Sequence, residues 1–273
     1  MHPSVNPDFA NRLLQPPAAK DDKYSRGVVG FATGSSKYPG AALLGINAAF
    51  ELAIGMVCYQ GPDSVKQLVL GNRPEVVIGL EKSQALVLGS GVEEGDAEQA
   101  RLIKEQSQRN LPMVIDAGAL QLVDFEKSLA PSVLTPHYAE AAKLLAKFGK
   151  PISKEEIQAD SASAASLLAE LTGQVVLLKG SITQIAISGF EPIESGPGST
   201  YLATAGTGDV LAGMIGTLIA KAITLEIDVT VGVIAELALI ATQLHSEAAE
   251  IAARKGEFGA SAVSRAISEA LID

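Results

Sequence analysis

The sequence has few of the residues that mark secreted or membrane proteins. Its 273 residues include one cysteine, Cys58, so no disulfide can form within the chain and a reducing compartment is expected. Residues 1–24 carry Asn, Pro, Asp and Lys without an apolar centre, unlike a secretory signal peptide. No uninterrupted apolar run reaches the roughly 20 residues that span a bilayer. We therefore expect a soluble, cytoplasmic protein.

Positive charge is also scarce. The chain has 21 Lys and Arg against 31 Asp and Glu, a formal net charge of −10, and no basic block. Nucleic acids and anionic membranes are therefore poor candidates as partners. Any anionic ligand has to be held by local donors rather than by the overall field of the protein.

Apolar residues, in contrast, are abundant enough for a large core. They make up 47% of the chain while charged residues make up 19%, which is typical of a folded globular protein. The length fits one large α/β domain or two small ones. We interpret residues 1–25 as an N-terminal arm with a helical turn at 11–15, and residues 26–273 as a single domain. The arm either packs on a neighbouring subunit or stays mobile.

Short apolar strands alternate with helices through most of the chain. The predicted strands are 27–31, 56–59, 75–78, 85–88, 112–115, 132–135, 174–178 and 184–187. The predicted helices include 41–53, 62–70, 98–108, 154–171, 210–220, 230–254 and 261–272. Strands that read as continuous apolar runs indicate a parallel sheet buried on both faces, with ligands bound beyond the carboxyl ends of its strands.

Several polar or glycine-rich segments stand at those strand ends. Glycine loops follow two strands at 32–40 and 89–91, and Asp116 follows a third. His137 lies at a strand-to-helix turn, although a single histidine is more often structural. Lys179 opens a tight turn between two strands, where it either meets a phosphate or lies solvated at the edge.

The stretch Gly206-Thr207-Gly208-Asp209 precedes an apolar helix that starts near Val210. The glycines allow a tight turn, and the first free amides of a helix favour a phosphate or a developing anion. Asp209 could accept a proton from a hydroxyl in the same turn, a combination that suits phosphoryl transfer. The alternative is an ordinary helix start with Asp209 as its N-cap. The sequence has no HExxH, no paired CxxC and no convincing Ser-His-Asp arrangement, and we interpret Glu236 and His245 as packing or surface residues.

Taken together, several motifs resemble one family, the ADP-dependent NAD(P)H-hydrate dehydratases of the ribokinase-like superfamily. The motifs are Tyr38-Pro39-Gly40-Ala41-Ala42, Leu88-Gly89-Ser90-Gly91, Val114-Ile115-Asp116-Ala117, Leu134-Thr135-Pro136-His137 with Glu140, Leu178-Lys179-Gly180 with Thr183, and the segment 205–213. The resemblance covers about residues 27–272. It implies a three-layer α/β/α ribokinase-like fold with a mostly parallel central sheet.

The resemblance also implies an activity. Members of the family are lyases of metabolite repair that dehydrate the S epimer of hydrated NADH or NADPH, consuming ADP and releasing AMP and phosphate. ATP in place of ADP stays open. Magnesium is expected with the nucleotide, with ligands that the sequence does not identify. The family further implies a homotetramer and a separate epimerase as functional partner.

Site residues follow from the same resemblance. Those expected to bind the adenine nucleotide are Lys179, Gly180, Ser181, Ile182, Thr183 and Gly208. Those expected to contact the hydrated cofactor are Ala41, Gly91, His137 and Asp209. Asp209 is the expected catalytic base, and the expected anion hole is made by Gly206, Thr207 and Gly208.

Three positions depart from the family pattern. Ser90 stands where the family has proline, Ala139 where it has glycine, and Gly118 where it often has aspartate. Gly118 therefore lacks a carboxylate near the expected site.

Two other functions stay open. A ribokinase-like kinase of a small alcohol (a hydroxymethylpyrimidine, a thiazole or a sugar) shares the Gly206–Asp209 turn, but the motifs around His137 and Lys179 favour the dehydratase. A nucleotide-binding regulatory or assembly protein on a degenerate fold is the non-enzymatic alternative, and the presence of Asp209 argues against it.

Overall fold

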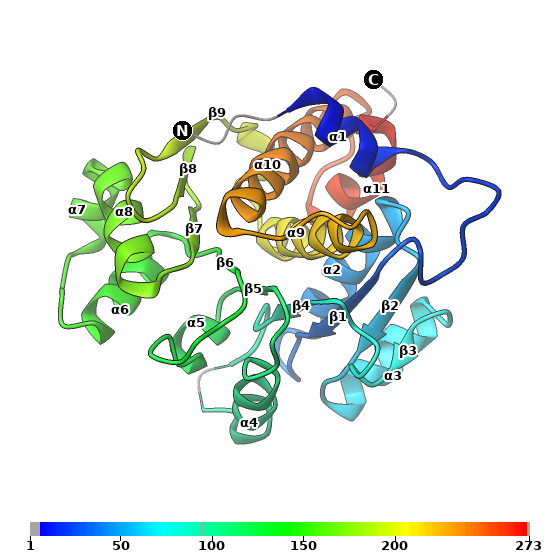
Figure 1. Cartoon of the computed structure of the whole chain (residues 1–273), viewed down its shortest axis with the longest axis horizontal. Coiled ribbons are helices and arrows are strands. Elements are labelled where there is room, and N and C mark those ends of the chain that lie inside the picture. The colour runs from blue at the N-terminus through cyan, green and yellow to red at the C-terminus, as the bar shows by residue number, and fades with distance from the viewer. Residues whose placement is uncertain (1–5, 94, 272–273) are drawn as a thin grey trace.

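The computed structural model describes residues 6–93 and 95–271 and shows a three-layer α/β/α fold (Figure 1). Its sheet has nine strands in the order β3-β2-β1-β4-β5-β6-β7-β8-β9. The pairs from β3 to β7 are parallel, and β8 and β9 join the edge antiparallel. This mostly parallel sheet confirms the fold class expected from the sequence.

The elements have the following bounds. The strands are β1 Val28–Ala32, β2 Met56–Tyr59, β3 Val77–Ile78, β4 Ala85–Leu88, β5 Met113–Ile115, β6 Val133–Leu134, β7 Val175–Leu178, β8 Ile182–Ala186 and β9 Ile193–Pro197. The helices are α1 Pro7–Leu14, α2 Pro39–Glu51, α3 Asp63–Asn72, α4 Ala97–Gln106, α5 Ala119–Leu122, α6 Tyr138–Lys147, α7 Lys154–Ala159, α8 Ser161–Thr172, α9 Thr207–Thr224, α10 Val231–Arg254 and α11 Ala260–Ala270, with a short 3-10 turn η1 Thr200–Leu202.

Two apolar cores flank the sheet, one on each face. Successive residues of a strand point to opposite faces, so Val29 and Phe31 of β1 pack with α2, α9, α10 and α11, while Val28 and Ala32 pack with helices α4 to α8. Strands buried in this way carry no alternation of polar residues, which explains their continuous apolar runs.

Helix α9 crosses the centre of one sheet face. It is long and apolar enough to cross a membrane. However, 72% of its 18 residues are buried inside the protein, as expected of a core helix. Its glycines allow close contact: a Cβ on Gly213 would lie 2.4 Å from the carbonyl oxygen of Gly45 in α2, and one on Gly216 would lie 2.3 Å from Val87 of β4. The N-terminus of α9 is therefore held firmly over the carboxyl ends of the strands.

The N-terminal segment contains a longer helix than the turn expected at 11–15. Helix α1 begins after Asn6, whose side chain caps it, and buries Leu13 in the core that contains α9. The Asn6 amide also donates to Glu236 of α10 at 2.5 Å. Glu236 therefore holds the N-terminal arm against helix α10 of the domain.

Two expected elements differ from the structure. The single helix expected over 154–171 is two helices, because Asp160 (φ −137°) ends α7 and caps α8 by accepting from the Ser163 amide. An Asp followed by Ser is a helix-start signal that the alanine-rich periodicity obscured. Strand β9 is absent from the strands expected from the sequence; it pairs with β8 and so extends the sheet by one strand.

Candidate active site

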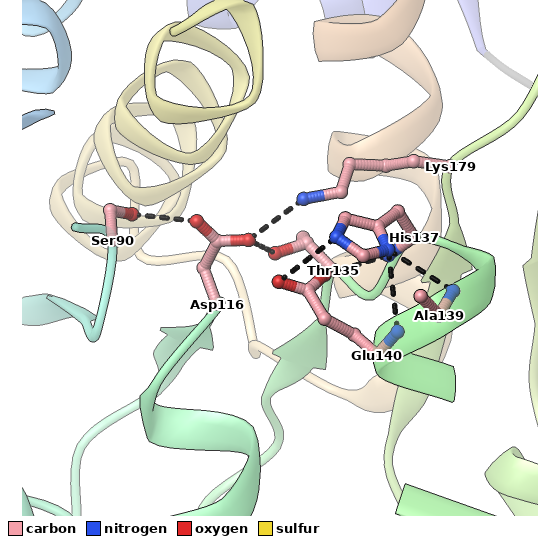
Figure 2. Close-up of polar contacts among 7 residues, drawn as sticks. All are labelled: Ser90, Asp116, Thr135, His137, Ala139, Glu140 and Lys179. Atoms are coloured by element: carbon pink, nitrogen blue, oxygen red, sulfur yellow. Dashed lines mark hydrogen bonds and ion pairs between the residues drawn. The ribbon is translucent and has the colours of Figure 1, made fainter. Parts of the chain in front are cut away.

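The site is built around Asp116, which directly follows β5. Its side chain is buried and accepts three hydrogen bonds, from Ser90 Oγ at 2.8 Å, Thr135 Oγ1 at 2.7 Å and Lys179 Nζ at 2.9 Å. Figure 2 shows these donors converging on the carboxylate from the ends of three neighbouring strands. The serine at position 90, a departure from the family pattern, thus supplies a donor that proline could not.

His137 is the N-cap of α6. Its Nδ1 accepts from the amides of Ala139 at 3.1 Å and Glu140 at 3.3 Å, and Glu140 Oε2 accepts from the His137 amide at 2.9 Å (Figure 2). This reciprocal capping fixes the ring and its tautomer. The imidazole is about half exposed, so Nε2 is the nitrogen left to face a ligand, 3.5 Å from Glu140 Oε1.

The Gly206–Asp209 turn has the geometry of an anion site. Gly206 is the N-cap with φ 93°, a conformation that suits glycine, and the first bond of the helix runs from the Val210 amide to the Gly206 carbonyl at 3.2 Å. The amides of Thr207, Gly208 and Asp209 therefore precede the helical hydrogen-bond ladder. Asp209 lies within the first turn, so the alternative in which it is the N-cap is wrong.

The two charged residues of this site shift each other's protonation. Burial, together with the charge of Asp116, raises the pKa of Asp209 to about 7, although the charge of Lys179 opposes this rise. Burial disfavours the charged form of Lys179, but the carboxylates Asp116, Glu140 and Asp209 outweigh it and raise its pKa. Near neutral pH the site therefore holds a charged lysine beside a carboxyl group that titrates in the same range, as a general base requires.

A cavity of about 410 Å³ lies beside the turn and collects most of the residues predicted for the nucleotide. Its lining includes Lys179, Gly180, Ser181, Thr183, Thr207 and Gly208. The Lys179 ammonium stands over Gly208, because a Cβ there would lie 3.4 Å from Nζ. Ile182 is not part of this lining; it starts β8 with 39% of its surface exposed.

His245 of α10 lines the same cavity, although we interpreted it as a packing or surface residue. It is buried, and its Nε2 has no hydrogen-bond partner among the described residues. Burial, together with the charge of Lys179, lowers its pKa to about 4, so the ring is neutral. No local sequence pattern in α10 marks His245 as a site residue. It lines this cavity only because α10 packs on the ends of the strands.

Ala41 and Gly91, predicted for the hydrated cofactor, lie against each other. A Cβ on Gly91 (φ 68°) would be 2.4 Å from that of Ala41. A cavity of about 420 Å³ nearby is lined by their neighbours Tyr38 and Val92 and by Glu140, but not by Ala41, Gly91 or His137.

Gly118 also lines this second cavity. The structure explains why glycine stands here, where the family often has aspartate. A Cβ there would lie 2.7 Å from the carbonyl oxygen of Val92, so an aspartate would require the Val92 loop to move.

The larger cavity of about 660 Å³, between α4, α5 and α6, contains none of the predicted site residues.

The comparisons with known proteins agree with this geometry. The family model for NAD(P)H-hydrate dehydratase matches residues 29–272. The chain belongs to the NAD(P)H-hydrate dehydratase family. The family resemblance drawn from the motifs is thereby confirmed, and its match covers nearly the whole described domain.

Two relatives illustrate how this family member compares in sequence. It is 39% identical over 215 residues to the bifunctional NAD(P)H-hydrate repair enzyme Nnr of Mycobacterium tuberculosis, covering 75% of this chain and 43% of that protein. It is 32% identical over 253 residues to the ADP-dependent (S)-NAD(P)H-hydrate dehydratase of Neisseria meningitidis, covering 86% and 80%. The chain thus spans less than half the length of its bifunctional relatives.

Solved structures of the dehydratase family superpose on nearly all of the chain. The ADP/ATP-dependent NAD(P)H-hydrate dehydratase of Bacillus subtilis, co-crystallized with ATP and Mg²⁺, has a TM-score of 0.78 at 25% identity and covers 99% of this chain and 96% of its own. A hydroxyethylthiazole kinase of Pyrococcus horikoshii, with a TM-score of 0.63 at 16% identity over 97% and 91% of the two chains, shares the fold alone.

The side chains of this site offer too few metal ligands to hold magnesium without a nucleotide. Among the described residues no group of three or more His, Cys, Asp or Glu could hold a metal ion. Magnesium usually takes one or two carboxylates plus phosphate oxygens and water. Both carboxylate oxygens of Asp116 already accept hydrogen bonds, from Ser90, Thr135 and Lys179, so this carboxyl group alone does not define a magnesium site.

Proposed function

We propose that the chain catalyses the ADP-dependent dehydration of the S epimer of hydrated NADH or NADPH, giving NAD(P)H, AMP and phosphate. The observation that carries the proposal is Asp209, a carboxyl group with a pKa near 7 in the first turn of α9, beside free helix amides and Lys179. Base, anion hole and cation are together where a hydroxyl would be phosphorylated. The name of the Neisseria relative supports the same reaction.

In this reaction Asp209 accepts the proton of the ring hydroxyl as the hydroxyl oxygen bonds to the β-phosphorus of ADP. The bond from that phosphorus to the α,β-bridging oxygen breaks and AMP leaves. The amides of Thr207 and Gly208 stabilise the charge on the moving phosphoryl group, and Lys179 supports them with its ammonium. Phosphate then leaves the ring with the C–O electron pair, and loss of a proton from the adjacent ring carbon restores the double bond.

Magnesium enters with the nucleotide. When bound, it would neutralise negative charge on the nucleotide phosphates. The ATP and Mg²⁺ of the Bacillus structure support a metal–nucleotide complex, with ADP as the donor that we propose here.

The setting of the enzyme is also a proposal. We infer a cytoplasmic homotetramer: the family resemblance implies the tetramer, and a chain with one cysteine is compatible with a reducing compartment. The word bifunctional in the names of the repair-enzyme relatives supports a second repair activity as partner, which the family resemblance implies to be an epimerase. Size-exclusion chromatography with light scattering tests the tetramer, and addition of an epimerase to an assay that contains both hydrate epimers tests the partnership.

The decisive assay mixes the whole chain with the S epimer of hydrated NADPH, Mg²⁺ and ADP, and follows the absorbance of the reduced nicotinamide. We expect a nucleotide-dependent rise that falls by about 10²–10⁴-fold in Asp209→Asn, which loses the base. ADP binding by calorimetry should survive in this variant because the amides and Lys179 are retained. Loss of ADP binding together with turnover would contradict this division of roles.

A second outcome would redirect the proposal. If the hydrate is not dehydrated with ADP or ATP, but a small alcohol becomes stably phosphorylated, the chain is a kinase of the same fold.

A further inference from the structure

A small cavity with an excess of positive charge lies between the N-terminal arm and the far end of α9. It encloses about 280 Å³. Its polar lining residues are Arg12, Gln15, Lys20, Asp21, Ser25, Arg26, Lys221 and Thr224. Four cationic side chains thus face one carboxylate, in a protein whose formal net charge is −10.

The single carboxylate does not neutralise these cations. Asp21 accepts from the Ala18 amide at 2.7 Å and from Ser25 Oγ at 3.2 Å. Among the described residues no ion pair joins Arg12, Lys20 or the other two cations to an acidic side chain.

Two of the cations are held in place by the end of helix α2. Lys221 Nζ donates to the Leu52 carbonyl at 3.1 Å, and Arg26 Nη2 donates to the Ala53 carbonyl. An ammonium has three N–H donors and a guanidinium has five, so most of their donors have no partner among the described residues. Burial and the charge of Arg26 lower the pKa of Lys221 to about 8, which shows that its charge is poorly compensated.

We propose that this cavity binds a small, multiply charged phosphate-type anion, which bridges the N-terminal arm to helix α9. Arginine forks match phosphate oxygens bidentately, and the cavity volume suits inorganic phosphate or diphosphate. The anion joins Arg12 of α1 and Lys20 of the arm to Lys221 of α9. Lys221 lies 12 residues beyond Asp209, roughly 18 Å along the helix, so this site is distinct from the candidate active site.

The proposal is independent of the catalytic function and is tested on the whole chain by limited trypsin digestion. Trypsin can cut the arm after Lys23 and Arg26. We expect diphosphate, and phosphate at higher concentration, to slow these cuts at least about tenfold. ADP is run in parallel, since slowing by ADP alone would assign the effect to the nucleotide cavity and overturn the proposal.

The double variant Arg12→Ala/Lys20→Ala removes both arm cations without touching the two helix-capping contacts. The matched control, Lys23→Ala/Lys150→Ala, removes the same charge from exposed positions outside the cavity. We expect the protection after Arg26 by diphosphate to be lost in the first variant and kept in the second. Equal protection in both variants, or equal protection of the unmodified chain by citrate, would overturn the phosphate site.

Discussion

At the scale of residues, two carboxyl groups of the site differ in what surrounds them. Asp116 accepts hydrogen bonds from Ser90, Thr135 and Lys179, whereas no described side chain donates a hydrogen bond to Asp209. Burial without donors raises the pKa of Asp209 to about 7. A carboxyl group with three hydrogen-bond donors and one without side-chain donors therefore stand at the same edge of the sheet.

The raised pKa of Asp209 makes a prediction about stability. Between its ordinary pKa of 3.8 and about 7 the folded protein binds more protons at this group than the unfolded chain, so its contribution to stability falls as pH rises. We expect Asp209→Asn to equal the unmodified protein in stability near pH 4 and to exceed it by about 1–3 kcal/mol at pH 8. Urea unfolding of both proteins across this range measures the difference, and a difference that does not change with pH would refute the assignment.

Thr135 gives a second prediction at this scale. Thr135→Val keeps the volume but takes a donor from the buried Asp116, and we expect a loss of about 1.5–3 kcal/mol in unfolding free energy. Thr33→Val is the matched control, because Thr33 is also buried but its Oγ1 has no partner among the described residues. The control should be neutral or stabilising. Similar losses in both variants would show that the bond to Asp116 contributes little.

At the scale of elements, the position of α9 depends on its close contact with α2. Gly213 of α9 meets the backbone of Gly45 in α2, and a Cβ on Gly45 would lie 3.2 Å from the Asp209 carbonyl oxygen. The glycines thus decide how far the Gly206–Asp209 turn stands from the strand ends.

The same substitution should therefore have opposite effects in two helices. Gly213→Ala places a Cβ 2.4 Å from a carbonyl oxygen, and we expect it to destabilise the protein by about 1–3 kcal/mol. Gly232→Ala in α10 meets only Thr230 Oγ1 at 3.7 Å and should stabilise by about 0.5 kcal/mol. Thermal unfolding of the two variants compares them directly. A harmless Gly213→Ala would mean that α2 and α9 can separate at little cost.

At the scale of the whole molecule, the sheet excludes solvent from both faces. Cys58 lies in β2, between β1 and the edge strand β3, is 1% exposed, and burial raises the pKa of its thiol. A thiol of this kind reacts only when the sheet opens.

Labelling of Cys58 by an aromatic disulfide reagent should therefore report the opening of the whole domain. We expect no reaction in the native protein over minutes and one thiol after unfolding in urea. If the domain opens and closes faster than Cys58 is labelled, the labelling rate follows the population of the open domain. ADP that binds only the folded protein, at ten times its dissociation constant, should then slow labelling about tenfold. Rapid labelling without denaturant would show that β2 opens locally.

Much of this protein can be predicted from the sequence because local patterns determine it. The continuous apolar strands indicated the parallel sheet. The family resemblance singled out the Gly206–Asp209 and Lys179–Thr183 turns, and residues of both turns line one cavity. The break at Asp160 was missed because a cap signal competes with strong helical periodicity.

Other features depend on residues that are distant in the chain. Ser90, Asp116, Thr135 and Lys179 are hydrogen-bonded because four strands end at one edge, and no local pattern predicts which partner each one takes. His245 reaches the cavity beside the Gly206–Asp209 turn only through the packing of α10. The sequence by itself therefore determined the elements, the sheet and the residues available for chemistry. Only the tertiary structure decided their partners, their burial and hence their protonation, because those properties depend on distances between segments far apart in the chain.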